Sequence, residues 1–321
     1  MPSNDDPNSG EARGMGSLSW DVDTKSYTSE KSLVNDIIKN LEESGACIVR
    51  NLIDIESINQ ILEDMDPFVK APSECEFFAK EVTAVSGLVG RSETFALKVV
   101  GNTVWQKVLD HFLKHQYGPY WAGEEQYTSY CAAQLGSSAG LGLAPGAKAQ
   151  MLHRDDSAHR HWSKEAEKYD VGRDLCLTSL TACTKTTRAN GGTRVVPGSH
   201  LWDYSRPPPV DNDGVVDTEL NPGDSLIILG SVIHGHGANT TTDENRMVLG
   251  CGACCDYLRQ EENQYLSHSQ DFVRRLPESI QRFIGYSTFD PAGGTAHWKD
   301  PWQVLNDKKP GVQENSIPCK A

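Results

Sequence analysis

The feature that most constrains the fold is a succession of short apolar segments, separated by glycine- and proline-rich turns, that begins near residue 127. The segments are rich in Val, Ile, Leu, Thr and Cys, and the turns carry Asn-Gly-Gly, Pro-Gly and Asn-Pro-Gly-Asp sequences. Strands are predicted at residues 129–134, 149–153, 175–183, 194–196, 225–229, 232–234 and 247–255. Many short strands without intervening helices predict a β-sandwich or jelly roll and exclude a βαβ fold.

Helices are predicted ahead of this β-rich core. Apolar residues at helical spacing indicate an amphipathic helix over residues 31–41. A strand is predicted at 46–50, followed by a helix that Asp54 caps and Pro67 ends. A third helix is predicted at 103–115. The first third of the chain is therefore expected to flank the strands with helices.

The 321 residues are interpreted as one domain, at residues 17–290, between two tails. Its predicted parts are a disordered tail at 1–16, a helical flank at 30–115, a jelly-roll core at about 127–257, a closing helix at about 270–286 and a C-terminal tail at 291–321.

Composition argues against several classes of protein. The net charge of −14 and the lack of a basic stripe argue against nucleic-acid binding. The sequence has no run of roughly 18 apolar residues, so no membrane span is expected. The N-terminus lacks the apolar core of a secretion signal, and nine cysteines without a secretory context predict reduced thiols. We therefore expect a cytoplasmic protein.

The segment His153-Arg154-Asp155 is the first candidate for chemistry. On a strand, residues two apart project to the same face, so the imidazole and the carboxylate would converge. A nitrogen ligand from a distant strand would complete a two-histidine, one-carboxylate triad, which holds non-haem Fe(II) and leaves coordination positions open. This pattern is weak by itself, because a hydrogen-bonded surface histidine beside a turn aspartate gives the same sequence.

Further motifs follow in a fixed order. They are an Asn-Gly-Gly-Thr segment at 190–193, an Asn-Pro-Gly-Asp turn at 221–224, an Ile-His-Gly-His-Gly segment at 233–237 and Arg246, twelve residues after His234. Together with the His-x-Asp pair, this set resembles the phytanoyl-CoA dioxygenase family of Fe(II)- and 2-oxoglutarate-dependent oxygenases. The resemblance runs from about residue 45 to about 286, and is greatest to fungal members that tailor secondary metabolites.

The resemblance implies a mainly β fold with flanking helices, namely a double-stranded β-helix (a cupin-like jelly roll). It implies Fe(2+), 2-oxoglutarate and O2 as cofactors. The implied metal ligands are His153, Asp155 and His234, and the implied partner of the 2-oxoglutarate carboxylate is Arg246. A planar guanidinium suits that task because it binds a carboxylate bidentately. Residues implied to contact the cosubstrate are Gln150, Thr193 and, with a surface charge as the equal alternative, Arg91.

Two ligand positions have a rival nearby. Strand alternation turns Asp156 away from the face of His153, which favours Asp155. His234 and His236 would share a face, so alternation does not separate them. His234 follows the apolar pair Val232-Ile233, whereas His236 lies between glycines, where a loose, turning backbone is expected. The family pattern also places its ligand at the first histidine.

Residues 157–173 form an insertion directly after the ligand pair. We predict a lid over the iron in which Trp162 and His161 face the substrate, since long loops at the mouth of a barrel often carry specificity. A solvated loop or helix is the equally weighted alternative.

These observations predict an oxygenase that acts on a small, mostly apolar natural product of meroterpenoid, terpenoid or alkaloid type. An acyl-CoA is disfavoured because its phosphates require Lys and Arg. Hydroxylation is the expected default reaction, and the resemblance implies desaturation or radical rearrangement as further possibilities. The resemblance also allows for a homodimer. A cupin-like isomerase that does not use 2-oxoglutarate and a non-catalytic binding protein of the same fold are the alternatives.

Overall fold

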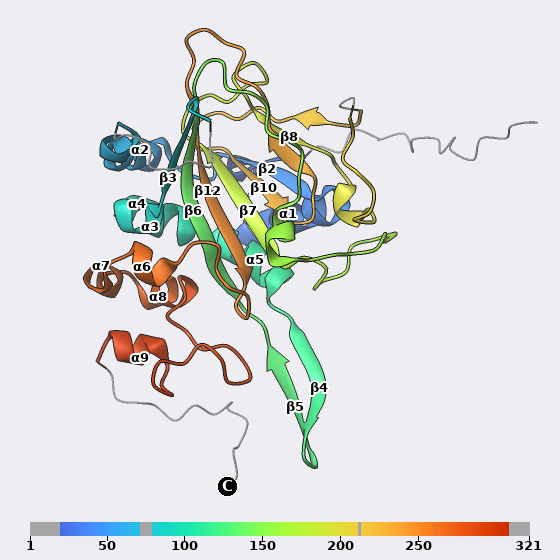
Figure 1. Ribbon diagram of the computed structural model, residues 1–321, viewed down its shortest axis with the longest axis vertical. Helices are drawn as coiled ribbons and strands as arrows, with labels where there is room; N and C mark the ends of the chain where they lie inside the picture. The colour runs from blue at the N-terminus through green and yellow to red at the C-terminus, as the bar shows by residue number, and fades with distance from the viewer. Residues whose placement is uncertain (1–19, 71–78, 211–212, 308–321) are drawn as a thin grey trace, which may run out of the picture.

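The computed structural model describes residues 20–70, 79–210 and 213–307 (Figure 1). The predicted tail at 1–16 lies outside the described residues, as does the end of the predicted C-terminal tail. Residues 291–307 are described, and they contain a short helix, α9 (Pro301–Leu305), so this part of the predicted tail is folded.

Two sheets form the β core. The strands of the larger sheet, in spatial order, are β1 (Asp21–Asp23), β2 (Ala46–Arg50), β10 (Ser225–Leu229), β7 (Cys176–Ala182), β12 (Arg246–Cys255), β6 (Ala133–Leu143) and β3 (Val82–Ser86). The smaller sheet has the order β11 (His234–His236), β8 (Thr193–Val195) and β9 (Val216–Asp217). All of these pairings are antiparallel except β1 with β2. The predicted jelly roll is confirmed.

Strand β10 lies between two hydrophobic clusters. Ile227 and Leu229 belong to the cluster that the helices share, whereas Leu226 and Ile228 pack in a second cluster with Val195 of β8. Side chains alternate across a strand, so a strand that is apolar at every position can be buried on both faces. This strand therefore joins the core between the sheets to the core beneath the helices.

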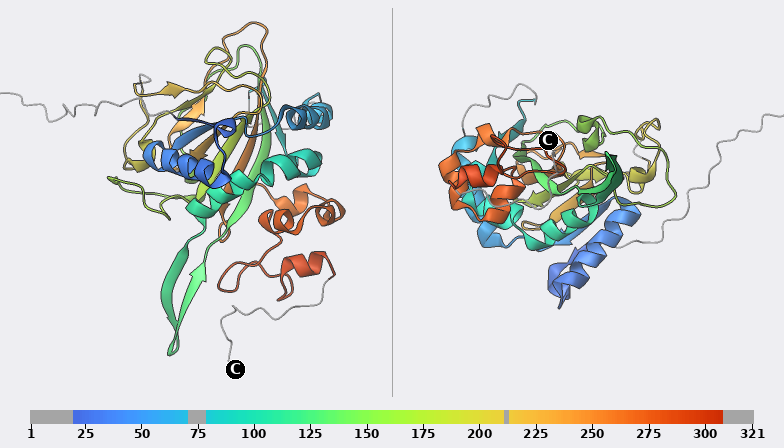
Figure 2. Two further views of the ribbon diagram at one scale, coloured as in Figure 1. Left: turned by 180° about the vertical axis from the view of Figure 1, so that it is seen from behind. Right: turned by 90° about the horizontal axis from the view of Figure 1, so that it is seen from below.

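Helices cover one face and one edge of the larger sheet (Figures 1 and 2). The α-helices are α1 (Glu30–Ser44), α2 (Ile55–Val69), α3 (Leu88–Arg91), α4 (Glu93–Phe95), α5 (Thr103–Leu113), α6 (Gln264–Ser267), α7 (Gln270–Arg275), α8 (Glu278–Phe283) and α9; 3-10 turns are η1 (Thr24–Ser26), η3 (Asp155–His159) and η4 (Ser199–Leu201), and η2 (Ala96–Val100) is a π-helical turn. In α1 the apolar face predicted from the sequence is buried, and Gly45 ends the helix in a left-handed conformation.

Several predicted boundaries were wrong. Residues 149–153 form no strand: His153 makes a single bridge to His234. Helix α2 continues past Pro67 to Val69, so that proline lies in its last turn. The closing helix at 270–286 is two helices, α7 and α8, since Pro277 lies between them and lacks an N–H.

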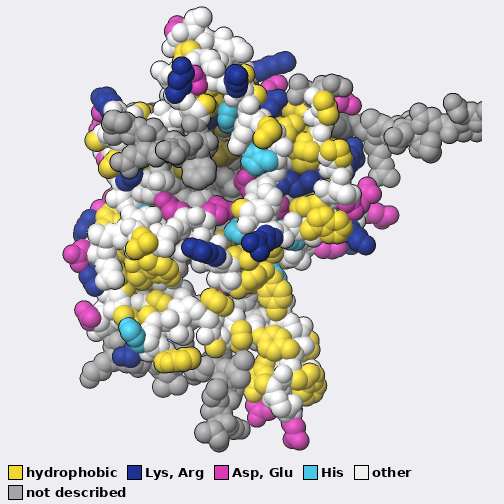
Figure 3. Space-filling view, in the orientation of Figure 1, with side chains coloured by type: hydrophobic (Ala, Val, Ile, Leu, Met, Phe, Trp, Pro, Cys, Tyr) yellow, Lys and Arg dark blue, Asp and Glu magenta, His cyan; other side chains and the backbone are white. Residues whose placement is uncertain are grey.

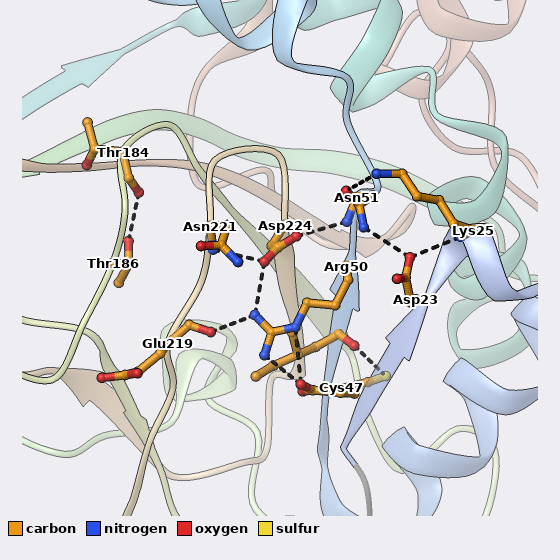
Figure 4. Close-up of polar contacts among 12 residues, drawn as sticks. Asp23, Lys25, Cys47, Arg50, Asn51, Thr184, Thr186, Glu219, Asn221 and Asp224 are labelled. Carbon is orange, nitrogen blue, oxygen red and sulfur yellow. Dashed lines mark hydrogen bonds and ion pairs between the residues drawn. The ribbon is translucent and has the colours of Figure 1, made fainter.

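Arg50 fastens the N-terminal strands to the larger sheet (Figure 4). Its guanidinium forms ion pairs with Asp21 at 2.6 Å and with Asp224 at 2.9 Å. Asp224 also accepts hydrogen bonds from the backbone N–H groups of Asn51 and Asn221. The Asn-Pro-Gly-Asp turn that precedes β10 is thereby tied to β1 and β2.

A hairpin of β4 (Gln116–Ala122) and β5 (Glu125–Tyr130) projects from the body (Figures 1 and 2). Trp121 and Tyr130 are exposed, and hydrophobic side chains follow the hairpin in the space-filling view (Figure 3). None of the described helices is long and apolar enough to cross a membrane. Every cysteine in the described ranges has a free thiol.

Candidate metal centre and its cavity

The two predicted histidine ligands are brought together by main-chain hydrogen bonds. The N–H of each residue donates to the carbonyl oxygen of the other at 2.9 Å, which joins the segment before η3 to the start of β11. The rings consequently lie side by side, with centroids 4.6 Å apart. Asp155 begins η3, and this turn carries its carboxylate back toward both rings. The 3-10 turn replaces the strand geometry predicted for the His-x-Asp pair.

The donor atoms of His153, Asp155 and His234 face one point. Oδ1 of Asp155 lies 3.4 Å from Nε2 of His153 and 3.4 Å from Nε2 of His234. Ligand atoms about 2.1 Å from a metal and about 90° apart are separated by about 3 Å, so these spacings fit one face of a coordination sphere. Within the described chain, this is the one group of three such side chains close enough to hold a metal ion.

Hydrogen bonds around the centre fix which atoms are free to bind. Nδ1 of His153 lies 2.9 Å from the carbonyl oxygen of Met151, and Nδ1 of His234 lies 3.1 Å from that of Val232. A ring nitrogen that donates to a carbonyl leaves the other nitrogen as a lone-pair ligand. Each Nε2 is therefore available to a cation.

The second carboxylate oxygen of Asp155, Oδ2, accepts a hydrogen bond that fixes the orientation of the carboxylate. Oγ1 of Thr178 on β7 donates to Oδ2 at 2.9 Å. Burial opposes ionisation of Asp155, but His234 and His153, together with this hydrogen bond, hold its pKa well below the usual range. The centre thus combines two imidazole nitrogen donors with one oxygen anion, the ligand set of non-haem iron oxygenases.

The rival positions face elsewhere. Asp156 is fully buried and accepts a hydrogen bond from the hydroxyl of Tyr204, away from the histidines. Burial raises its pKa to about 7. His236 points into the same cavity as His234 but is not part of the three-residue group. The backbone of His236 is paired with Thr193 in a regular strand, so the prediction of a loose, turning backbone at this residue was wrong.

Arg246 is a buried cation next to the centre. Its side chain is 2% exposed, and Nη2 and Nε donate to the carbonyl oxygen of Gly191 at 2.6 and 3.2 Å. In the described ranges no carboxylate lies within ion-pair distance of it, and burial lowers its pKa to about 10. A buried charge without a counter-ion is costly, so this guanidinium is suited to an anionic ligand.

Of the three remaining residues predicted to contact the cosubstrate, two line the cavity and one does not. Gln150 and Thr193 both line the cavity, and Oε1 of Gln150 accepts a hydrogen bond from the backbone N–H of His236 at 3.3 Å. Arg91 is not among the lining residues: it lies at the end of α3, and its guanidinium stacks over Phe68, 4.2 Å from the ring centroid. The described structure therefore gives Arg91 no contact with this cavity, in contrast to the prediction.

The cavity has a volume of about 400 Å³ and lies between the sheets. Large apolar side chains surround the end of the cavity near Arg246. Residues with small side chains form the floor of the other end, near η3. Its apolar and small lining residues are Val82, Ser137, Ala139, Leu141, Leu143, Ser157, Ala158, Leu180, Val248, Gly250 and Gly252.

Comparison with known proteins decides the family. Dioxygenase cnsJ of Penicillium expansum is 36% identical over 284 residues, which cover 88% of this chain and 85% of that protein. Dioxygenase himG of Aspergillus japonicus is 36% identical over 293 residues, covering 88% and 89%. The sequence model of phytanoyl-CoA dioxygenase (PhyH) matches residues 41–248. The chain belongs to the phytanoyl-CoA dioxygenase family.

Solved structures share the fold of this phytanoyl-CoA dioxygenase family member. The non-haem α-ketoglutarate-dependent carbocyclase SnoK from nogalamycin biosynthesis superposes with a TM-score of 0.51 at 17% identity, over 75% of this chain and 92% of that one. HygX from Streptomyces hygroscopicus, solved with nickel and 2-oxoglutarate, gives 0.50 at 12%, over 73% and 89%. At such identities the likeness establishes the jelly-roll architecture.

Membership of the phytanoyl-CoA dioxygenase family confirms the enzyme class expected from the sequence. Enzymes of this family are dioxygenases that use Fe(II), 2-oxoglutarate and O2. The three-residue centre and the buried Arg246 fit these cofactors, because they offer ligands for the cation and a counter-charge for the organic anion.

The insertion at 157–173 does not form the predicted lid. Trp162 is 56% exposed and is not a lining residue, and His161 packs edge-on against Tyr204, with ring centroids 5.7 Å apart. Ser157 and Ala158, in the turn that follows Asp155, are the residues of the insertion that reach the cavity.

Sequence reasoning missed Thr178 and Glu261, which both line the cavity. Thr178 carries no local signal, since any strand has threonines. The floor of the cavity did carry a sequence signal. Gly250 and Gly252 are two residues apart on one strand, and glycines on one face of a strand leave room for a ligand.

Proposed function

We propose that this dioxygenase oxidises a small, mostly apolar natural product in secondary metabolism, with release of succinate and CO2. The observation that carries the proposal is the cavity itself. Apart from the metal centre and a few polar groups, it is lined by aliphatic and small side chains, and its two arginines, Arg154 and Arg246, are engaged with backbone carbonyl oxygens. An acyl-CoA would need several free basic residues for its phosphates, and no lysine is among the lining residues.

In this proposal His153, Asp155 and His234 hold the iron, and each ring is fixed by a carbonyl oxygen of its own chain. Thr178 keeps one oxygen of Asp155 turned toward the metal. When bound, Fe(II) supplies the activation of O2 that couples decarboxylation of 2-oxoglutarate to oxidation of the substrate.

Arg246 binds the far carboxylate of 2-oxoglutarate in this arrangement. Its Nε and Nη2 are held by Gly191, so the guanidinium is oriented before the cosubstrate arrives. Gln150 and Thr193 lie in the same cavity and supply polar contacts. Leu141, Leu143 and the other aliphatic side chains at this end exclude water, which strengthens the pairing of opposite charges.

The reaction is proposed to be hydroxylation by default, with desaturation or radical rearrangement as the variants. A cupin-like isomerase or a binding protein of this fold remains the contrasting function. The buried Arg246 favours the oxygenase, because a protein without an anionic ligand has no use for an unpaired buried cation.

Anaerobic titration of the Fe(II) protein with 2-oxoglutarate tests the proposal. A weak visible charge-transfer band that saturates at one equivalent is expected for a ketoacid chelated to Fe(II). Candidate meroterpenoids, terpenoids and alkaloids are then compared by the succinate formed per oxidised product. Absence of the band, or turnover that does not require 2-oxoglutarate, would favour the isomerase or the binding protein.

A further inference from the structure

The two ends of the cavity carry opposite charge. Arg246 begins β12 and is paired in register with Leu143 on β6, whereas Gly252 of the same strand is paired with Ser137. The hydroxyl of Ser137 donates to the carboxylate of Glu261. Six residues of strand separate the two positions, or roughly 20 Å along β12 at 3.3 Å per residue. A cation therefore lies at one end and an anion at the other.

Glu261 lies after β12, with its carboxylate in a fixed orientation. Oε2 accepts the hydrogen bond from Ser137 at 2.7 Å, and Oε1 lies 3.3 Å from Nε2 of His159. The side chain of His159 is 5% exposed and is not among the lining residues, whereas Glu261 is 34% exposed and lines the cavity. The imidazole thus lies beside the carboxylate without lining the cavity, and the carboxylate stays open toward it.

No strong cation neutralises this carboxylate. Among the residues that the structure describes, Glu261 forms no ion pair with a lysine or an arginine. Arg154 donates instead to the carbonyl oxygens of Ser231 and Ser199 and stacks on Tyr204. Arg246 lies at the far end of the cavity, where it would pair with the carboxylate of 2-oxoglutarate. A carboxylate facing a half-enclosed cavity is best satisfied by a cationic ligand.

The floor next to Glu261 leaves space for that ligand. Ala139, Gly250 and Gly252 lie between Glu261 and the aliphatic end, and none of them has a side chain beyond a methyl group. A rigid hydrocarbon skeleton can rest on this floor while a charged group reaches Glu261. Asp155 and its histidines lie along the same cavity, so such a skeleton would reach the metal centre.

We propose that the substrate carries a protonated amine and that Glu261, oriented by the hydrogen bond from Ser137, binds this amine. The proposal rests on the proposed function and narrows its substrate class to basic, nitrogen-containing natural products. Glu261 acts as a specificity-determining residue that sets which end of the substrate enters first.

Matched probes test this assignment. Tryptamine is a cation at neutral pH, and tryptophol has the same skeleton with a hydroxyl in place of the ammonium group. Their affinities are measured by calorimetry on the anaerobic Fe(II) and 2-oxoglutarate complex of the full chain. Wild-type protein should bind tryptamine about fivefold or more tightly than tryptophol, as expected for one partly buried ion pair. Glu261→Gln should abolish the preference and leave tryptophol affinity unchanged.

Glu167→Gln is the matched control, because it makes the same change in net charge at an exposed residue outside the cavity. It should keep the wild-type preference. Equal binding of both probes to wild-type protein, binding of neither up to their solubility limits, or a preference that survives in Glu261→Gln would overturn the assignment. The iron content and the 2-oxoglutarate affinity of the same samples report on the proposed function separately. Wild-type protein that binds neither iron nor 2-oxoglutarate contradicts the proposed function. Wild-type protein that binds both but does not prefer the amine contradicts only the role of Glu261.

Discussion

At the scale of single residues, the metal centre depends on hydrogen bonds that select one atom of each ligand. Met151 and Val232 engage Nδ1 of the two histidines through carbonyl oxygens, and Thr178 engages one oxygen of Asp155. Only the first two of these bonds come from residues near the ligand in sequence. The orientation of Asp155 therefore depends on a different strand.

Thr178→Val is expected to weaken iron binding by about 10- to 100-fold, because supporting hydrogen bonds orient ligands and tune their basicity. The change keeps the shape of the side chain and removes only the donor to Asp155. Iron affinity measured by competition with a chelator checks this expectation. An affinity equal to that of wild-type protein would show that Asp155 needs no such support.

The choice between His234 and His236 predicts different metal contents. His234→Ala should lose iron and all turnover, since its Nε2 belongs to the three-residue group. His236→Ala should keep one iron per chain and change only rate or product choice. Metal analysis of both purified variants decides the matter, and the reverse pattern would transfer the ligand role to His236.

Arg246→Ala is expected to weaken 2-oxoglutarate binding while iron stays bound. Leaving the cosubstrate carboxylate unpaired should cost about 2–5 kcal/mol. The anaerobic charge-transfer titration reports the dissociation constant directly. An unchanged constant would remove Arg246 from the cosubstrate site.

At the scale of elements, strands β6 and β12 form the floor of the cavity and η3 forms part of its rim. Their pairing brings Gly252 opposite Ser137 and Arg246 opposite Leu143. The floor is consequently continuous from the cationic end to the acidic end. The strand predicted at 129–134 includes only the first two residues of β6, because the glycines of β6 interrupt the alternation of apolar residues.

Trp162→Ala should change the free energy of unfolding by less than about 0.5 kcal/mol, since exposed side chains contribute little. It should also leave the product distribution unchanged, because Trp162 is not a lining residue. Ala158→Trp, four residues earlier and at the cavity, should lower turnover by narrowing the entrance. Urea unfolding and product analysis of both variants test this; altered products from Trp162→Ala alone would restore the lid hypothesis.

At the scale of the whole molecule, burial of ionisable groups makes stability depend on pH. His200 is fully buried, and its Nε2 lies 3.0 Å from the carbonyl oxygen of Glu42 on α1. Burial lowers the pKa of His200 to about 4, an effect that Arg173 reinforces. Between pH 6.5 and 4 the unfolded chain therefore binds more protons at this residue than the folded chain.

Acidification from pH 6.5 to 4 should consequently remove up to about 3 kcal/mol of stability through His200. His200→Gln lacks this titration, so the stability advantage of wild-type protein over the variant should shrink as the pH falls. Denaturant unfolding of both proteins at several pH values measures the difference, and effects of the carboxyl groups common to both cancel. A difference that does not vary with pH would mean that His200 is not held neutral.

The sequence by itself determined the family, the class of fold and the identity of the three metal-binding candidates. The class of fold follows from apolar runs bounded by turn residues, whereas the family, the third ligand His234 and the role of Arg246 were implied by the resemblance that the ordered motifs carry. Such patterns survive without tertiary context because residue spacing and turn chemistry act over a few residues. Strand β10, predicted at 225–229, was found with the same limits.

Only the tertiary structure decided which side chains share the cavity. Ser137 and Glu261 are 124 residues apart in the chain, yet they form one hydrogen bond. Trp162 lies nine residues from His153 and is outside the cavity. Proximity in sequence fails here because strand pairing and loop direction set where a side chain points, and these depend on contacts made across the whole β core.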